Sequence, residues 1–367
     1  MMMKKILILV LGVTGCYAFA GNTGDPVDFT ENFVTGTPVI KSVSALAFGP
    51  QGILFIGDSR SAAIYAIETA DKSGAGDKIE MKSVDRQLAA ALGTTVDNIA
   101  IQDLVVHPVS KKVYVAVHHA DGTPALLILD GDRFVPVNLS NIRYSSIAIS
   151  NVVGEEAKDG RGRPLRVWTI SDLGYYDGKV MVSGLSNQEF SSTFRSIPFP
   201  FRQDEEMTSL EIYHASHGQY ETNSPIRTFT ATELDGKPYL VASYTCTPLV
   251  IFPIDQLKSG QHVKGRTVAE LGNRNTPLDM VTMKKEGKSY LLLANSSRAL
   301  MRISYDEIVS FKESLSSPVE NTAGVEFTAL PYVNVLQVDK LDDERFVLLQ
   351  RKADGNLDLM TVDSARL

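Results

Sequence analysis

Residues 43–67 have the sequence VSALAFGPQGILFIGDSRSAAIYAI. Two apolar runs, VSALAF and ILFI, flank the turn sequence GPQG, and a third run, IYAI, follows the polar loop GDSRS. Short apolar runs separated by Gly, Pro, Asp and Ser predict antiparallel strands joined by tight turns. Because a sheet of three or four short strands does not bury its own faces, this unit has to stack against further sheets.

The same strand-turn-strand pattern recurs about every 50–65 residues, which is the signature of a repeat fold. The second strands of the six copies are residues 53–56 (ILFI), 113–117 (VYVAV), 179–183 (KVMVS), 239–243 (YLVAS), 290–294 (YLLLA) and 346–350 (FVLLQ). Small sheets repeated radially protect their edges by closing into a ring. We therefore predict an all-β chain, a β-propeller of six blades. A seventh blade stays open as an alternative, because the stretch 134–166 is long enough to contain one.

The ring needs one strand from outside the repeats. The last copy ends near the carboxyl terminus with DLMTV (residues 358–362), so it lacks an outer strand. We expect the segment that starts with Val27-Asp28-Phe29 to supply this strand and close the ring.

The amino terminus has the pattern of an export signal. Residues 4–13 (KKILILVLGV) place two lysines before an apolar run that is too short to span a bilayer. Two processing interpretations stay open. Residues 18–20 (AFA) form a small-x-small cleavage site, whereas residues 13–16 (VTGC) resemble a lipoprotein box in which Cys16 is lipidated. In either case Cys16 is not available to Cys246, so no disulfide is predicted.

These observations divide the chain and place it outside the cytoplasm. The predicted protein is periplasmic or secreted, or it is an outer-membrane lipoprotein attached to the membrane only through Cys16. The predicted segments are a signal peptide 1–20 (or a lipoprotein signal 1–15), an N-terminal segment with the closing strand 21–42 and the propeller 43–367.

The charge balance excludes one class of partner. The formal net charge is -7 and the pI is about 5.5, and no stripe of Lys or Arg with interleaved aromatic residues is present. Phosphate backbones require a basic face. We therefore predict no nucleic-acid partner, and we expect a small-molecule ligand or an envelope protein partner.

Propeller geometry gathers several polar residues on one face. The loops between second and third strands, and the links between blades, lie together around one end of the channel. Arginines on this face suit an anionic group. The predicted ligand-binding residues are Asp58, Arg60, His118, Tyr220, Tyr244, Asn275, Asn295, Arg298 and Arg351.

Two groups of residues are candidates for a metal ion. His214, His217 and Cys246 offer imidazole and thiolate ligands, which suit zinc, copper or another divalent transition metal. Alternatively, the two histidines are ordinary polar residues of surface loops, and Cys246 is an inert packed residue. The second group consists of one Asp near the start of each of three inner strands, and the carboxylates of these residues also suit calcium. These residues are Asp103, Asp172 and Asp279.

The three aspartates also have a structural interpretation. Their side chains are placed to face the channel, where neighbouring carboxylates bind a cation or raise one another's pKa. Alternatively, each carboxylate hydrogen-bonds an exposed backbone donor between blades. For Trp168, the only tryptophan, we expect packing between blades.

The motifs GPQG, ILFIGDS and IYAI within residues 44–69 resemble repeats of the NHL, YncE-like and SMP-30/lactonase β-propellers. Enzymes of the lactonase type hold a divalent metal ion in the channel with Glu, Asn and Asp side chains. The resemblance implies such parts for Asn275, Asp279 and Asn295. The first inner strand, however, offers Ser44, Ala45 and Ala47 where that family places its Glu.

Three functional hypotheses follow. The first is an exported, non-catalytic or accessory propeller that binds a small ligand and a divalent metal ion on its loop face. The second is a metal-dependent hydrolase of the lactonase or esterase type. The third is an interaction scaffold of an envelope complex.

Overall fold

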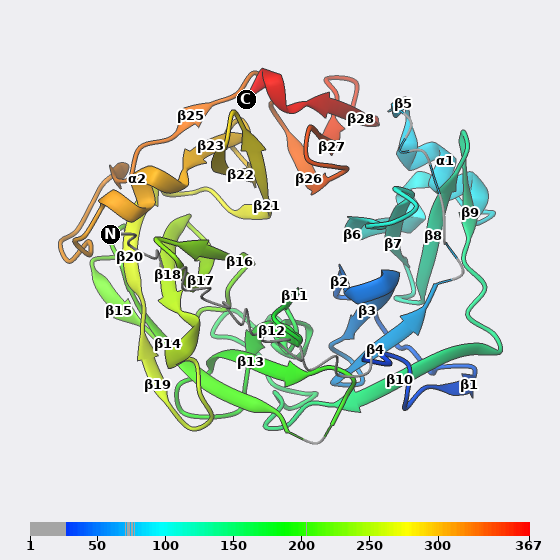
Figure 1. Ribbon diagram of the computed structural model, residues 1–367, viewed down its shortest axis with the longest axis horizontal. Coiled ribbons are helices and arrows are strands. Elements are labelled where there is room, and N and C mark those ends of the chain that lie inside the picture. Colours follow the sequence, from blue (N-terminus) through cyan, green and yellow to red (C-terminus); the bar gives the residue numbers. More distant parts are fainter. Residues whose placement is uncertain (1–26, 70, 72–73, 75, 77, 203) are drawn as a thin grey trace, which may run out of the picture.

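The computed structural model describes residues 27–69, 71, 74, 76, 78–202 and 204–367 (Figure 1). The predicted signal segment, including Cys16, lies outside these residues. Six sheets surround a central channel. Their innermost strands contact one another in the order β2, β11, β16, β21, β26, β6 and then β2 again. The predicted six-bladed propeller is confirmed, and we name each blade by its innermost strand.

From the channel outward, three blades have the following strands. The β2 blade consists of β2 (Ala45–Phe48), β3 (Ile53–Asp58), β4 (Ala63–Glu68), β10 (Ile142–Ala148) and β1 (Val34–Gly36). The β6 blade consists of β6 (Ile99–Val106), β7 (Val113–His119), β8 (Pro124–Asp130) and β9 (Arg133–Pro136). The β11 blade consists of β11 (Asp172–Tyr176), β12 (Lys179–Leu185), β13 (Ser192–Pro198) and β14 (Glu206–His214), with β15 (Gln219–Glu221) and β19 (His262–Lys264) both pairing with β14.

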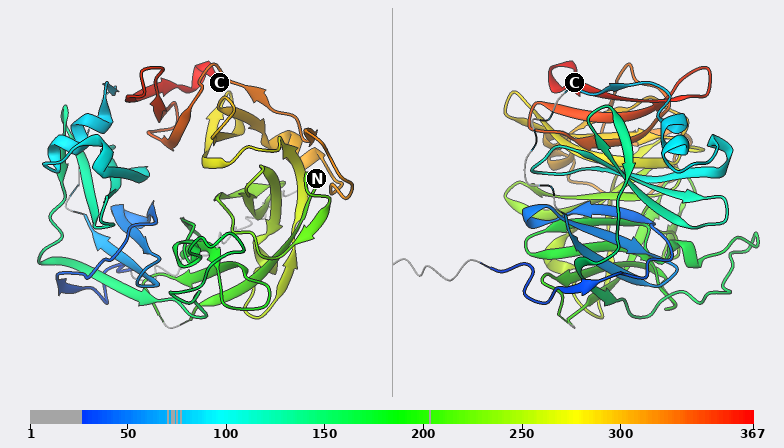
Figure 2. Two further views of the ribbon diagram at one scale, coloured as in Figure 1. Left: turned by 180° about the vertical axis from the view of Figure 1, so that it is seen from behind. Right: turned by 90° about the vertical axis from the view of Figure 1, so that its right-hand side faces the viewer.

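The other three blades complete the ring, which Figure 2 shows from behind and from the side. The β16 blade consists of β16 (Thr228–Leu234), β17 (Lys237–Ser243), β18 (Pro248–Pro253), β20 (Arg266–Leu271) and β24 (Thr322–Gly324). The β21 blade consists of β21 (Pro277–Lys285), β22 (Lys288–Asn295), β23 (Met301–Ser304) and β25 (Thr328–Ala329). The β26 blade consists of β26 (Val335–Lys340), β27 (Arg345–Arg351), β28 (Leu357–Asp363) and β5 (Glu80–Met81).

The order of the blades in the ring differs from their order in the chain. After β4 the chain adds β5 to the β26 blade, forms the β6 blade and then returns to the β2 blade as β10. In the ring, the β6 blade therefore lies between the β2 blade and the β26 blade, although β6 directly follows β2 among the inner strands of the chain. Because residues 133–148 form the outer strands β9 and β10 of two existing blades, the alternative of a seventh blade in 134–166 is wrong.

The closing strand is not the one that we expected. In the last blade β5 pairs antiparallel with β28, with Met81 opposite Leu359. The segment that begins at Val27 instead leads to β1, which pairs antiparallel with β10 at the outer edge of the β2 blade. The reason is the path of the chain: the connection after β4 reaches the last blade first, and the returning β10 leaves a free edge that β1 covers.

Local sequence explains the tight hairpins. In the two-residue turns between the first two strands of the β11, β16 and β21 blades, a residue with positive φ is followed by Gly. Asp177 and Gly178 have φ of 46° and 76°, and Asp235 and Gly236 have φ of 53° and 72°. Two successive residues with positive φ form the type I′ turn, whose twist matches that of the flanking strands.

The apolar core is divided among the interfaces between blades. One cluster of buried side chains fills each of the six interfaces. Phe55 of the β2 blade, for example, lies in one cluster with Leu173 and Val180 of the β11 blade. Burial of both faces of each sheet stabilises the ring and keeps the loop ends fixed.

Two short helices lie at the periphery. Helix α1 (Val84–Ala91) contacts β9 and β28, and helix α2 (Tyr305–Ser310) contacts β22 and β23. Neither of these helices is long and apolar enough to cross a bilayer, considering the residues that the structure describes.

Candidate functional site

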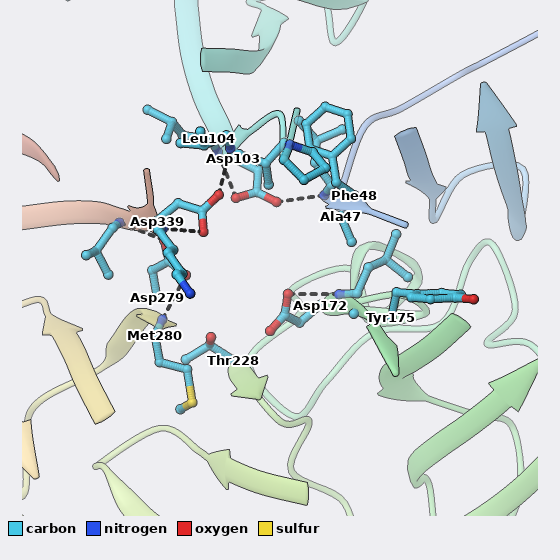
Figure 3. A pocket seen from close by; sticks show the side chains of 18 of the residues that line it. Ala47, Phe48, Asp103, Leu104, Asp172, Tyr175, Thr228, Asp279, Met280 and Asp339 are labelled. Atoms are coloured by element: carbon cyan, nitrogen blue, oxygen red, sulfur yellow. Dashed lines mark hydrogen bonds between the residues drawn. The ribbon is translucent and has the colours of Figure 1, made fainter. Parts of the chain in front are cut away.

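Four aspartates from four inner strands line the channel (Figure 3). Asp103 belongs to β6, Asp172 starts β11, Asp279 belongs to β21 and Asp339 belongs to β26. They surround a cavity of about 410 Å³, which Thr228 also lines. We call these four residues the channel aspartates.

Each channel aspartate joins two strands. Its Oδ1 accepts a hydrogen bond from the N–H of the next residue in its own strand, at 2.7–2.8 Å. Its Oδ2 accepts one from the inner strand of a neighbouring blade. These pairs are Asp103 with Leu46 (2.7 Å), Asp172 with Phe229 (2.8 Å), Asp279 with Val338 (2.8 Å) and Asp339 with Val106 (2.6 Å). The inner strand is the edge of its sheet, so these N–H groups have no strand partner, and the carboxylates satisfy them.

The channel aspartates also influence one another. Burial, with the charge of Asp172 next in importance, raises the pKa of Asp103 to about 8. Burial raises the pKa of Asp172 to about 7 and that of Asp339 to about 6. Burial and the charge of Asp103 hold the pKa of Asp279 well above its ordinary value. The group therefore retains protons near neutral pH.

A glutamine connects two of these carboxylates. With its amide turned so that both polar atoms are satisfied, the Gln337 nitrogen donates to Asp279 Oδ2 and Asp103 Oδ1, each at 3.0 Å. For the predicted residues Asp103, Asp172 and Asp279, the structure thus shows carboxylates that hydrogen-bond backbone donors between blades. Their role as metal ligands stays a prediction, and their oxygens already have protein partners.

A second group, His214, His217 and Cys246, comes together on the loop face. The ligand atoms of these three side chains lie within 4.8 Å of one another. His214 ends β14, and His217 lies in the turn before β15, where its N–H donates to the carbonyl of His214 at 3.1 Å. The two imidazole rings have centroids 3.8 Å apart. We call these three residues the His–Cys cluster.

Cys246 reaches the cluster from the next blade. It lies in the connection between β17 and β18, and its N–H donates to the carbonyl of Asn275 at 2.8 Å. Cys246 and Thr247 both have positive φ, 67° and 59°. Non-glycine residues rarely adopt this conformation, and such strain is concentrated at functional sites. Cys246 is half-buried and has no disulfide partner among the residues that the structure describes.

Glu221 orients both histidines. Its Oε2 lies 3.0 Å from His214 Nδ1, its Oε1 lies 2.6 Å from His217 Nδ1, and Ser224 Oγ donates to Oε2 at 2.8 Å. Burial raises the pKa of Glu221, but the hydrogen bonds from His214 and His217 outweigh it and lower the pKa to about 2. Because the ionised carboxylate only accepts, each Nδ1 donates its proton to Glu221, and in the neutral imidazole Nε2 is then the nitrogen that presents a lone pair.

Glu270 holds the turn between His214 and His217. Glu270 of β20 is buried, and its Oε2 accepts a hydrogen bond from the N–H of Ser216 at 3.1 Å. Burial raises the pKa of Glu270 to about 7, against the effect of the N–H groups of Ser216 and Ala215. This contact holds the backbone between His214 and His217 in place.

Two predicted ligand-binding residues line a separate cavity at the loop end of the channel. This cavity, which we call the mouth cavity, has a volume of about 330 Å³ and receives residues from five blades or their links. Arg60 and His118 line it together with Arg227 and Trp168. His118 Nε2 accepts a hydrogen bond from the N–H of Val43 at 2.9 Å, and burial, followed by the charge of Arg60, lowers its pKa. The expectation that Trp168 packs between blades is wrong, because Trp168 ends a short 3-10 helix (Arg166–Trp168) before β11 and is half-buried at this cavity.

Three other predicted residues make internal contacts. Asp58 is buried, and its carboxylate accepts hydrogen bonds from the N–H groups of Lys41 and Ser61 and from the Ser42 hydroxyl. Asn275 Nδ2 donates to Asn295 Oδ1 at 3.1 Å. The Asn275, Asp279 and Asn295 side chains that a lactonase-type cage would use are therefore engaged with protein groups.

The remaining predicted residues are distributed over the loop face. Tyr244 is buried, Tyr220 is 53% exposed on β15, and Arg351 is exposed at the end of β27. The Arg298 guanidinium lies against Gly272. The structure does not bring these four residues into one site with the mouth cavity.

Comparisons with known proteins do not assign a family. No protein-family model matches the chain, and no curated protein matches it. The chain is similar in structure to a putative oxidoreductase (glucose dehydrogenase) from Thermus thermophilus, with 12% identity, coverage of 90% of this chain and 100% of that chain, and a TM-score of 0.35. It is also similar to the PQQ-bound aldose sugar dehydrogenase from Streptomyces coelicolor, with 12% identity, coverage of 90% and 98%, and a TM-score of 0.32. At such values the similarity carries no argument about ligand or reaction, and the resemblance to NHL, YncE-like and SMP-30/lactonase proteins stays a prediction.

Several residues of these sites were not predicted from the sequence, among them Glu221, Asp339, Arg227 and Trp168. Glu221 follows His217 by four positions, and a carboxylate so close to two histidines is a usable signal for a group that orients metal ligands. Asp339 lies in the sixth inner strand, where repeat alignment points to an Asp. Arg227 and Trp168 lie in links between blades, which have no repeat pattern to place them.

Proposed function

We propose that this chain is an exported β-propeller that binds a transition-metal ion at the His–Cys cluster and a small ligand on the same face, in a non-catalytic or accessory role. Export is inferred from the basic and apolar residues 4–13. The proposal of a metal ion rests on the geometry of the cluster.

The burial of His214 gives the main support for a bound metal ion. Its side chain is only 2% exposed, and its Nε2 has no hydrogen-bond partner among the described residues. A buried nitrogen lone pair without a partner is unfavourable by about 1–3 kcal/mol. Cys246 and His217 each place a ligand atom within 4.8 Å of a ring nitrogen of His214, and a cation bound at Nε2 satisfies the unpaired nitrogen.

The ligand types define the class of metal. Two imidazoles and a thiolate favour zinc or copper over calcium, which takes oxygen ligands. Zn–N bonds of about 2.0–2.1 Å and a Zn–S bond of about 2.3 Å place tetrahedral ligand atoms about 3.3–3.6 Å apart. The ligand atoms of the cluster lie within 4.8 Å of one another, so metal binding requires the side chains to move closer together. His217, with a side chain that is 44% exposed, gives the ion a route from solvent.

The direct test is metal titration of the purified propeller after chelation. Co²⁺ should give intense thiolate-to-metal absorption, and Zn²⁺ should displace it. Cys246→Ser should abolish this band, and His214→Ala should weaken Zn²⁺ affinity about a hundredfold or more, because each removes one of three ligands. His262→Ala is the matched control, since His262 lies on β19 with Glu211. Equal affinity in wild type and His214→Ala would refute the site.

Glu221→Gln tests the orienting carboxylate. The amide has one acceptor and one donor end, so it satisfies only one of the two Nδ1–H groups and opposes the other. We expect the affinity for Zn²⁺ to fall about tenfold to a hundredfold, as for other groups that orient metal-bound histidines. Isothermal titration of the wild type and Glu221→Gln measures the change, with thermal unfolding of both metal-free proteins as the check on folding. An unchanged affinity would show that Glu221 does not act on the ligands.

A further inference from the structure

The mouth cavity is lined by two guanidinium groups. Arg60 and Arg227 approach it from different blades, and none of the described residues that line it is Asp or Glu. Arg60 is exposed, and its terminal nitrogen donates to the carbonyl of Gly122 at 3.3 Å. Arg227 is half-buried, and its Nε makes no hydrogen bond among the described residues.

Trp168 fixes the orientation of Arg227. The guanidinium carbon of Arg227 lies 4.3 Å from the centroid of the Trp168 ring. A guanidinium that stacks on an aromatic face keeps its N–H donors available, because these donors point outward in the plane of the guanidinium. A partly buried cation with unused donors is unfavourable unless an acceptor with negative charge binds to it.

The other polar groups of the mouth cavity offer few free hydrogen bonds. Ser42 donates to Asp58 at 2.6 Å, and Ser59 Oγ contacts both the carbonyl and the N–H of Ile170. His118 uses Nε2 as an acceptor and has a lowered pKa through burial. The two arginines are therefore the main groups available to a ligand.

The floor of the cavity limits the charge of that ligand. Gln102, Ser171 and Leu278 line the mouth cavity, and each directly precedes a channel aspartate. The channel aspartates that are ionised near neutral pH repel a dianion such as phosphate more strongly than they repel a monoanion held at the two arginines. A planar carboxylate also matches the geometry of a guanidinium.

From this arrangement we infer that the mouth cavity binds a small organic monocarboxylate, held by Arg227 and Arg60 beside Trp168. The inference deepens the proposed function, because it rests on a small ligand at the loop face and names its chemical class. It does not require the His–Cys cluster to hold a metal ion.

Trp168 makes the test direct, because it is the only tryptophan in the chain. Titration of the full-length mature protein with sodium benzoate, lactate, glucuronate and inorganic phosphate, followed by Trp168 fluorescence and calorimetry, gives the affinities. At least one monocarboxylate should bind in the wild type, and it should bind more tightly than phosphate. Arg227→Gln should weaken that binding about tenfold or more, and Arg227→Lys should not restore it fully, because Lys lacks the fork.

Two controls separate this inference from loss of folding and from the metal proposal. Arg60→Gln removes an exposed side chain, so it should fold normally and still weaken carboxylate binding, whereas Arg298→Gln on the same face should bind as the wild type does. Zn²⁺ affinity should be equal in the wild type and Arg227→Gln. The inference is overturned if no monocarboxylate binds, if phosphate alone binds, or if both Arg60→Gln and Arg227→Gln bind the carboxylate as tightly as the wild type.

Discussion

Asp103→Ala should lower the free energy of unfolding by about 2–4 kcal/mol, because it leaves two backbone donors without an acceptor. The Asp103 carboxylate accepts hydrogen bonds from the N–H of Leu46 in the β2 blade and from the N–H of Leu104 in its own strand. Leu46 and Leu104 are buried, so water replaces the lost acceptor poorly. The loss also removes one of the four carboxylate bridges between neighbouring blades.

Urea unfolding at pH 6.5 measures this effect. Asp97→Ala is the matched control, since Asp97 is exposed in the turn before β6 and should change stability by less than about 0.5 kcal/mol. At pH 8.5 the loss in Asp103→Ala should shrink, because removal of one carboxylate relieves repulsion among the other channel aspartates. A variant as stable as the wild type at both pH values would show that the bridges contribute nothing to the ring.

The repeat pattern was sufficient to predict the fold. Second strands such as ILFI and VYVAV, with turn residues at regular spacing, require stacked small sheets, and six copies define six blades. The path between blades was not predictable in the same way. The pairing of β5 with β28 and of β1 with β10 depends on which free edge a short segment reaches, and segments of two or three residues have no pattern that identifies their partner.

The candidate sites show the same division. His214, His217 and Cys246 were predictable as neighbours because propeller geometry assigns their loops to one face, and the structure brings their ligand atoms together. Arg298 and Arg351 satisfy the same rule, yet they do not reach the mouth cavity. Propeller topology predicts the face on which a loop lies, but not how far its side chains lie from the channel axis. The distance of a loop residue from the channel depends on loop conformation, which in the case of Arg227 is fixed by its contact with Trp168.

The metal-free propeller should become less stable as the pH rises from 6.5 to 8.5. The pKa values of Asp103 and Asp172 are raised in the folded protein to about 8 and about 7, whereas the unfolded value is about 3.9. The folded state therefore binds more protons than the unfolded state in this range, and the stability that these protons provide is lost as the pH passes the folded pKa values. Water in the channel screens the charges, so we expect a loss of about 1–3 kcal/mol.

The pH window matters because other buried groups act in the opposite direction below it. Burial lowers the pKa of His107 and His118, and their contribution to stability is lost as the pH falls below the unfolded value of about 6.5. Urea unfolding at pH 6.5, 7.5 and 8.5 in the presence of a chelator covers the range in which the channel aspartates, and also Glu270 with its pKa of about 7, lose protons. Asp172→Asn should be less stable than the wild type at pH 6.5 but should lose less stability on going to pH 8.5, because its amide does not ionise. A wild-type stability that is constant or rises over this range would mean that the channel aspartates are already ionised at pH 6.5. The hydrogen bonds that they accept from backbone N–H groups would then stabilise the ionised form.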